Sequence, residues 1–147
     1  MNVVGLGSAG CAIADTFAEY PQYNIFKIDV GLQGLKKDGI YNFPELADYQ
    51  DYEEKCPSFK SFFKPVSGDV IFVLAGSGKI SVACLRILEA LKDCNIHVIY
   101  IRPELELLSG NAKMAESICF NVLQEYARSG LLSRISLIEN KRVREVL

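Results

Sequence analysis

The sequence predicts a three-layer α/β fold, with a doubly wound, Rossmann-like and mostly parallel sheet in a single domain spanning residues 1–147. Three observations predict it. Short apolar runs alternate with segments of helical spacing, as in a parallel sheet covered by helices. The run Val70–Ala75 is continuously apolar, which is typical of a strand buried on both faces. Glycine-rich loops follow two of the apolar runs, at the strand end where open α/β sheets bind ligands.

The N-terminal segment is predicted to form a strand, a glycine turn, a helix and a second strand. The first strand covers Asn2–Val4, and the second ends in Asp29. Between them, Gly5 allows a tight turn, Gly7 lets backbone N–H groups approach an anion, and Gly10 lets the helix pack closely on the strand. A diphosphate is therefore expected at the positive end of this helix.

The remaining elements are expected in an order that continues the alternation. They are an edge strand at 40–43, a helix at 44–55, strands at 70–75, 95–101 and 135–138, and helices at 80–93, 109–129 and 140–147. Gly130 is expected to end the longest helix. Six aromatic residues are expected to cap one edge of the sheet rather than to form a base-stacking surface: Tyr41, Tyr49, Tyr52, Phe59, Phe62 and Phe63.

A second glycine loop, Gly76–Lys79, follows the run Val70–Ala75. It is not a Walker A loop, because Ile80 stands where a serine or threonine should follow the lysine. Lys79 is expected either to meet a phosphate or to be a solvated loop lysine. Because both glycine loops leave the same edge of the sheet, they are predicted to converge on one crevice.

Composition excludes several classes of function. The net charge of −2 gives no general attraction to nucleic acid, and no apolar run is long enough to cross a bilayer. The five cysteines are dispersed without a CxxC pair, which predicts reduced thiols in a cytoplasmic protein and no zinc site or other metal centre. The single histidine, His97, lies inside a predicted strand and is interpreted as a structural residue.

The order of motifs resembles the nucleotide-binding half of the tubulin/FtsZ superfamily. The resemblance is carried by Val3–Cys11, Ile28–Leu35 and Asp69–Gly78, and it continues through Arg102-Pro103 and Ser136–Lys141. It implies a nucleotide, GTP or GDP, with Mg²⁺ possible beside it, and a protein that works through self-association or through contact with another protein.

The chain departs from that family at several positions. Ala12 stands where the family has a guanine-reading asparagine, and Leu107 and Asn111 stand near its ribose-binding acid and arginine. The family's central helix, catalytic acidic loop and second domain are not found in the 147 residues. The resemblance therefore implies nucleotide binding with little or no GTP hydrolysis, and no catalytic residue is assigned.

The candidate ligand-binding residues come from the two glycine loops, from the acid that ends the second strand, and from the last matching segment of the resemblance. They are Gly5, Leu6, Gly7, Ser8, Ala9, Gly10, Cys11, Asp29, Gly76, Ser77, Gly78, Lys79 and Asn140.

Two alternatives stay open. In the first, the chain is an NAD(P)-type dinucleotide-binding domain, because Gly5, Gly7 and Gly10 fit that fingerprint and Asp29 lies 19 residues after Gly10, where an acid can hold a ribose. In the second, the site is degenerate, the glycines serve only close packing, and the domain is an interaction scaffold.

Overall fold

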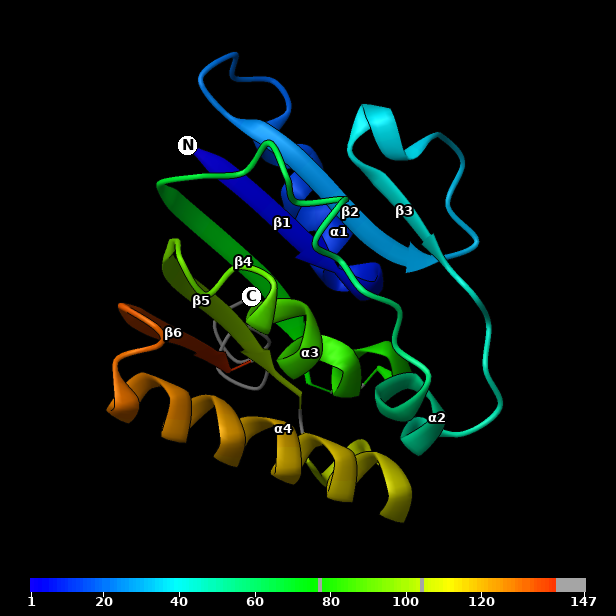
Figure 1. Ribbon diagram of the computed structural model, residues 1–147. Helices are drawn as coiled ribbons and strands as arrows, with labels where there is room; N and C mark the ends of the chain where they lie inside the picture. The colour runs from blue at the N-terminus through cyan, green and yellow to red at the C-terminus, as the bar shows by residue number, and fades with distance from the viewer. Residues whose placement is uncertain (77, 104, 140–147) are drawn as a thin grey trace.

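The computed structural model describes residues 1–76, 78–103 and 105–139, and it confirms the predicted fold class. Its six strands form one parallel sheet in the order β3-β2-β1-β4-β5-β6 (Figure 1). The strands are β1 (Asn2–Leu6), β2 (Asn24–Val30), β3 (Ile40–Phe43), β4 (Asp69–Ala75), β5 (Asn95–Arg102) and β6 (Arg134–Glu139). The helices are α1 (Gly7–Phe17), α2 (Tyr49–Glu54), α3 (Cys84–Glu89) and α4 (Gly110–Ser129), with 3₁₀ turns η1 (Lys36–Asp38), η2 (Lys79–Ala83) and η3 (Leu105–Leu107).

The strand order reverses direction between β1 and β4. From β1 the chain moves outward to β2 and β3, whereas from β4 it moves the opposite way to β5 and β6. Right-handed crossovers therefore place α1 behind the sheet and α3 in front of it, as Figure 1 shows. The carboxyl ends of β1 and β4 border the crevice that this reversal leaves, which is where ligands bind in such sheets.

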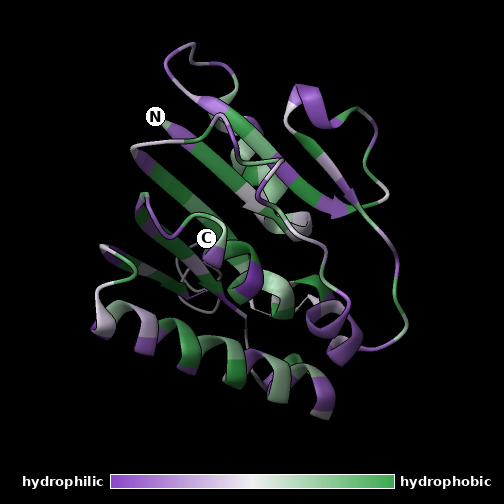
Figure 2. Ribbon diagram, viewed as in Figure 1, coloured by the Kyte–Doolittle hydropathy of each residue, from purple (hydrophilic) through white to green (hydrophobic). Residues whose placement is uncertain are grey.

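The two central strands are buried on both faces, as the apolar run in β4 predicts. Val3 and Val4 in β1, and Phe72 and Val73 in β4, are all fully buried. Because successive side chains point to opposite faces, these pairs supply two separate packing layers. Val4 and Phe72 join the main core with Ile87 of α3. Figure 2 shows the matching pattern, with apolar residues concentrated along the central strands.

An aromatic cluster covers the sheet beside β2 and the edge strand β3, which confirms the expected capping role for five of the six aromatic residues. Its rings are in contact, with centroids 4.4 Å apart for Tyr41 and Phe59 and 5.5 Å apart for Phe43 and Tyr52. Phe62 and Phe63 are also buried in it. Tyr49 is separate from this cluster and only half-buried.

Two predicted helices are shorter than expected. The helix expected at 44–55 begins only at Tyr49. Before it, the chain runs from the sheet edge in a non-helical conformation, and the Leu46 amide donates to the Tyr52 hydroxyl (3.0 Å). The helix expected at 80–93 opens as a 3₁₀ turn and ends at Glu89. At the start of this segment, the Ser81 hydroxyl donates to the Ala75 carbonyl, which ties the 3₁₀ turn to the end of β4.

The longest helix ends as the sequence predicts. Ser109 caps the start of α4 by accepting a hydrogen bond from the Ala112 amide, and Gly130 ends it in the left-handed conformation (φ 88°). The helix expected at 140–147 lies outside the described residues. Over the described ranges, we find no helix with the length and apolar character that a bilayer crossing requires.

Candidate functional site

A cavity of about 470 Å³ lies at the carboxyl ends of β1, β2 and β4. Its volume falls in the range of small-molecule sites. It is lined by Leu6, Gly7, Ser8, Ala9, Ala12, Asp29, Val30, Tyr52, Ala75, Gly78, Lys79, Ile80 and Ser81. Both glycine loops therefore contribute to one cavity at the point where the strand order reverses, as their positions in the sequence predict.

The first loop presents an uncapped helix end to this cavity. Helix α1 begins at Gly7, directly after β1, and Leu6 at its N-cap makes no side-chain capping bond. Gly7 has a φ of 76°, a left-handed conformation that favours glycine. Ser8 and Ala9 are exposed at the cavity wall. The N–H groups of this first turn, together with the helix dipole, suit an anionic group.

Gly5 and Gly10 serve the packing beneath the loop. A Cβ atom on Gly5 would collide with the Gly10 carbonyl, and one on Gly10 would collide with the Val73 carbonyl. These two glycines therefore bring α1 against β1 and β4, and neither lines the cavity. Their close approach fixes the direction in which the helix end points.

Cys11 lies on the same packed face of α1. Its Sγ is 3.5 Å from the Gly5 carbonyl oxygen and 3.6 Å from that of Ile28. Burial, with the nearby Asp29 charge, raises the pKa of the Cys11 thiol to about 11. At neutral pH this thiol is protonated, and its surroundings are those of a packing residue.

Asp29 supplies a carboxylate to the cavity. Its Oδ1 accepts a hydrogen bond from the Val30 amide (2.8 Å), while among the described residues Oδ2 accepts none. The loop after β2 is held by Asn42, whose Oδ1 accepts from the Gly31 amide (2.9 Å) and the Leu32 amide (3.2 Å). The carboxylate is thus fixed in orientation with one oxygen available to a ligand.

The second loop is constrained by the core below it. Its Gly76 amide donates to the Ile101 carbonyl (3.2 Å), and a Cβ atom on Gly76 would collide with the Tyr100 hydroxyl. Gly78 is exposed at the cavity wall. The Lys79 ammonium donates to the Ala47 carbonyl (3.0 Å) and lies 6.0 Å from the Tyr49 ring centroid.

A buried polar cluster supports this second loop. The carboxylate of Glu116, on α4, is only 1% exposed and accepts from the Tyr100 hydroxyl (3.1 Å) and from Arg102 Nε (3.2 Å). The Arg102 guanidinium also lies over the Phe120 ring, 4.5 Å from its centroid. Burial raises the pKa of the Tyr100 hydroxyl far above its usual range, so Tyr100 remains the donor. Gly76 is therefore a packing glycine.

The structure divides the predicted site residues into three groups. The cavity is lined by Leu6, Gly7, Ser8, Ala9, Asp29, Gly78 and Lys79. The packing beneath the loops contains Gly5, Gly10, Cys11 and Gly76. Ser77 and Asn140 lie outside the described residues. Contact between any of these residues and a nucleotide stays a prediction.

Several cavity residues were not predicted. Ile80 and Ser81 directly follow the second loop, so their positions in the sequence were sufficient to include them. Tyr52 lies on the short helix α2, inside an irregular segment, and no motif marks it. It is 97% buried in the aromatic cluster, yet one part of it borders the cavity.

His97, the one histidine and a candidate for acid–base chemistry, does not line this cavity. His97 Nε2 is 2.8 Å from the Ser136 hydroxyl, and burial lowers the pKa of the imidazole. In the described portion of the chain, no group of three or more His, Cys, Asp or Glu side chains is placed to hold a metal ion.

Comparison with known proteins bears on the fold. No protein-family model and no curated protein sequence matches the chain. Among solved structures, the chain is similar to a short-chain dehydrogenase/reductase from Burkholderia vietnamiensis, with a TM-score of 0.57 and 12% sequence identity, over 95% of this chain and 84% of that one. At this identity the likeness shows the fold alone. The chain therefore has an α/β, Rossmann-like fold.

Proposed function

We propose that this domain binds a nucleotide through its ribose and its 5′-diphosphate. The observation that carries the proposal is the position of Asp29 and the uncapped end of α1 on the walls of one cavity. A nucleotide with a diphosphate has two matching parts, an anion and a hydroxyl-bearing sugar, next to each other.

The diphosphate fits the first turn of α1. The N–H groups there have no capping side chain, and the exposed Ser8 adds a hydroxyl donor. By contrast, the N-cap residue of α4 is Ser109, and its hydroxyl accepts a hydrogen bond from the Ala112 amide of the same helix. The α1 end thus keeps its donors available at the cavity wall, where the helix dipole favours negative charge.

The ribose fits Asp29. A carboxylate that accepts one bond from the chain has capacity left for ribose hydroxyl donors. A phosphate at that position would be repelled by the same charge. The two ends of the cavity therefore favour one orientation, with the phosphates on α1 and the sugar at the end of β2.

Two kinds of nucleotide supply this shared chemistry. The resemblance to the tubulin/FtsZ superfamily favours GDP or GTP, with Mg²⁺ possible beside the phosphates, and with occupancy that biases self-association or docking to another protein. The spacing from Gly10 to Asp29 favours an NAD-type dinucleotide. Asp29 is the sole carboxylate among the described lining residues. As the resemblance implies, the proposed form binds with little or no GTP hydrolysis.

Calorimetric titration with GDP, GTP, ADP, NAD and inorganic pyrophosphate tests the proposal, with light scattering on the same samples. We expect Asp29→Ala to lower nucleotide affinity at least about tenfold, the loss of one charge-assisted hydrogen bond. Pyrophosphate affinity should stay the same or rise, because that ligand has no ribose. Asp15→Ala is the matched control: it removes a carboxylate at the far end of α1, where Asp15 pairs with Lys27 (3.0 Å) outside the cavity.

The set of ligands that bind distinguishes a guanine nucleotide from an NAD-type dinucleotide. Binding of GDP with a rise in scattering, and no binding of NAD, would support the tubulin/FtsZ-like form. Binding of NAD and ADP without GDP would support the dinucleotide form. The proposal is overturned if no nucleotide binds, or if Asp29→Ala and Asp15→Ala have the same effect.

A further inference from the structure

Two cysteines distant in the sequence meet in the core beside the second loop. Cys84 is the first residue of α3, and Cys119 lies midway along α4. Their Sγ atoms are 3.3 Å apart, and both residues are buried. A disulfide requires a separation of about 2.05 Å, so the two sulfurs need to approach each other by only about 1 Å.

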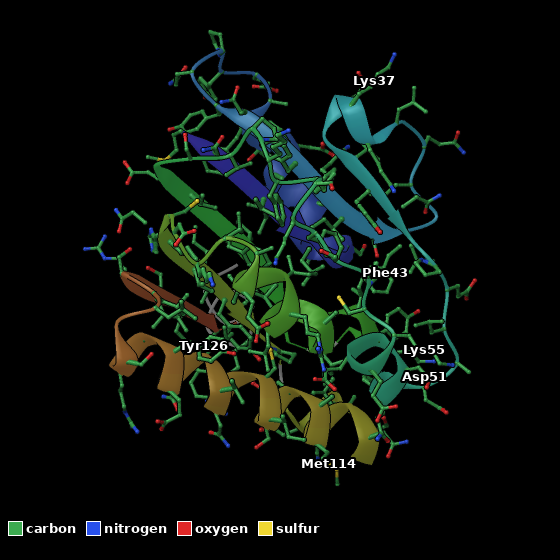
Figure 3. All side chains as sticks on the ribbon, viewed as in Figure 1. Lys37, Phe43, Asp51, Lys55, Met114 and Tyr126 are labelled. Carbon is green, nitrogen blue, oxygen red and sulfur yellow. The ribbon has the colours of Figure 1, made fainter. Side chains whose placement is uncertain are left out.

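An open groove leads to this pair. The groove has a volume of about 520 Å³, and both cysteines line it. Its rim includes Met114 and Ile118, which are 65% and 54% exposed. Figure 3 shows Met114 projecting outward from α4. The groove therefore brings solvent up to the residues that enclose the two sulfur atoms.

The pair also contacts a wall of the nucleotide cavity. Cys119 Sγ lies 3.8 Å from the Ser81 carbonyl oxygen, and the Ser81 hydroxyl donates to the Ala75 carbonyl at the end of β4. Ser81, Ile80 and Lys79 belong to η2 and line the cavity. Any movement of the Cys119 sulfur toward Cys84 therefore changes a contact that supports η2.

We propose that Cys84 and Cys119 form a reversible disulfide when the protein meets a low-molecular-weight disulfide of the glutathione class. The bond ties α3 to α4 across the groove. As a second step, which rests on the proposed nucleotide binding, it changes the affinity of the cavity through η2.

The chemistry balances as two thiol–disulfide exchanges. The Cys119 thiolate attacks one sulfur of the small disulfide, which forms a mixed disulfide and releases one small thiolate. Cys84 then attacks the Cys119 sulfur, and its proton passes to the second departing thiolate. The two protein thiols lose two electrons and two protons, and the small disulfide is reduced to two thiols. Cys119 is 2% exposed whereas Cys84 is fully buried, so we assign Cys119 as the first nucleophile.

Incubation of the full chain with oxidised glutathione, followed by thiol counting in denaturant and peptide mass mapping, tests the first step. We expect the count to fall from five free thiols to three, with a single bond linking the Cys84 and Cys119 peptides. Cys94→Ser is the matched control, because Cys94 is half-buried and lies outside the pair, so that variant should still form the bond. Cys84→Ser should stop at a glutathione adduct on Cys119.

The first step is overturned if the folded chain keeps all five thiols, or if the mapped bond joins other cysteines. The second step is tested by titrating the nucleotide that binds the reduced protein. We expect its affinity to change at least about fivefold on oxidation and to recover on reduction. An unchanged affinity overturns the coupling alone. Because thiol counting does not depend on a ligand, failure of the proposed function and failure of the disulfide are distinguishable.

Discussion

The two glycine loops of this domain look alike in sequence and differ in what lies beneath them. The loop at Gly7 begins an uncapped helix, and its exposed residues line the cavity directly. The loop at Gly76 rests on the buried Tyr100 hydroxyl and Glu116 carboxylate, and its Lys79 ammonium bonds to a backbone carbonyl. A glycine in such a loop is therefore required for one of two structural reasons. It leaves room for a ligand above the loop, or it leaves room for a core side chain below it.

The largest expected effect is on stability, at the second loop. Gly76→Ala places a Cβ atom against the buried Tyr100 hydroxyl, which donates to Glu116. Overpacking and the loss of that hydrogen bond both contribute to the effect. We expect a loss of about 4 kcal/mol in the free energy of unfolding, measured with urea. Gly78→Ala, two residues away, meets only Ser81 Oγ at 3.6 Å and should cost less than about 0.5 kcal/mol. Equal losses for the two variants would refute the distinction between them.

The next effect concerns the polar cluster under that loop. Glu116→Ala leaves the Tyr100 hydroxyl buried without its acceptor and Arg102 without its partner. Because Arg102 is partly exposed, we expect the free energy of unfolding to fall by about 3 kcal/mol, which is at the low end for breaking a buried ion pair. Glu125→Ala on the same helix removes an exposed pair with Arg128 and should change stability by less than about 1 kcal/mol. A small loss from Glu116→Ala would show that the cluster does not support the loop.

The base of the first loop is expected to show a pH dependence. Burial raises the Cys11 pKa to about 11 from 9.0, so the folded state holds this proton more tightly than the unfolded state does. The stabilisation that this raised pKa gives the folded state is fully present below pH 9.0. As the pH rises toward 11, about 2 kcal/mol of the free energy of unfolding is lost. Urea titrations from pH 8 to 11 should therefore show a shallower decline for Cys11→Ala than for the wild type. Parallel declines would mean that the thiol is less enclosed than its contacts indicate.

The smallest effect is expected at Lys79. Its ammonium is exposed and bonds to the Ala47 carbonyl, so Lys79→Ala should change stability by less than about 0.5 kcal/mol. We also expect less than about a threefold change in nucleotide affinity, because this amine is held by Ala47. Lys37→Ala, on an exposed 3₁₀ turn, is the control for a general loss of positive charge. A tenfold weaker affinity for Lys79→Ala alone would make the second loop a phosphate site after all.

Most of the fold was accessible from the sequence, because buried parallel strands produce apolar runs that are hard to mistake. Each predicted strand is present, and Ser109 and Gly130 bound α4 as their chemistry implies. The errors were in helix ends, where Ser81 and Tyr52 bond to backbone groups outside the expected helices. No local sequence pattern reports these contacts, because they depend on how the chain packs.

The site was less predictable than the fold for a related reason. Glycine spacing correctly indicates a turn, but it does not reveal which glycine faces a cavity and which faces the core. Gly76 looks like a ligand residue until Tyr100, 24 positions later, is seen beneath it. Likewise, the meeting of Cys84 with Cys119 depends on how α3 packs against α4.

The most direct test of the contrast between the loops is amide NMR on ¹⁵N-labelled protein during titration with GDP, and separately with NAD. The first turn of α1 should respond, so we predict that the amide signals of Gly7, Ser8 and Ala9 shift with ligand. The Gly76 amide, which donates to the Ile101 carbonyl, should stay in place. Shifts at Gly76–Lys79 with none at Gly7–Ala9 would contradict the account and assign the ligand to the second loop.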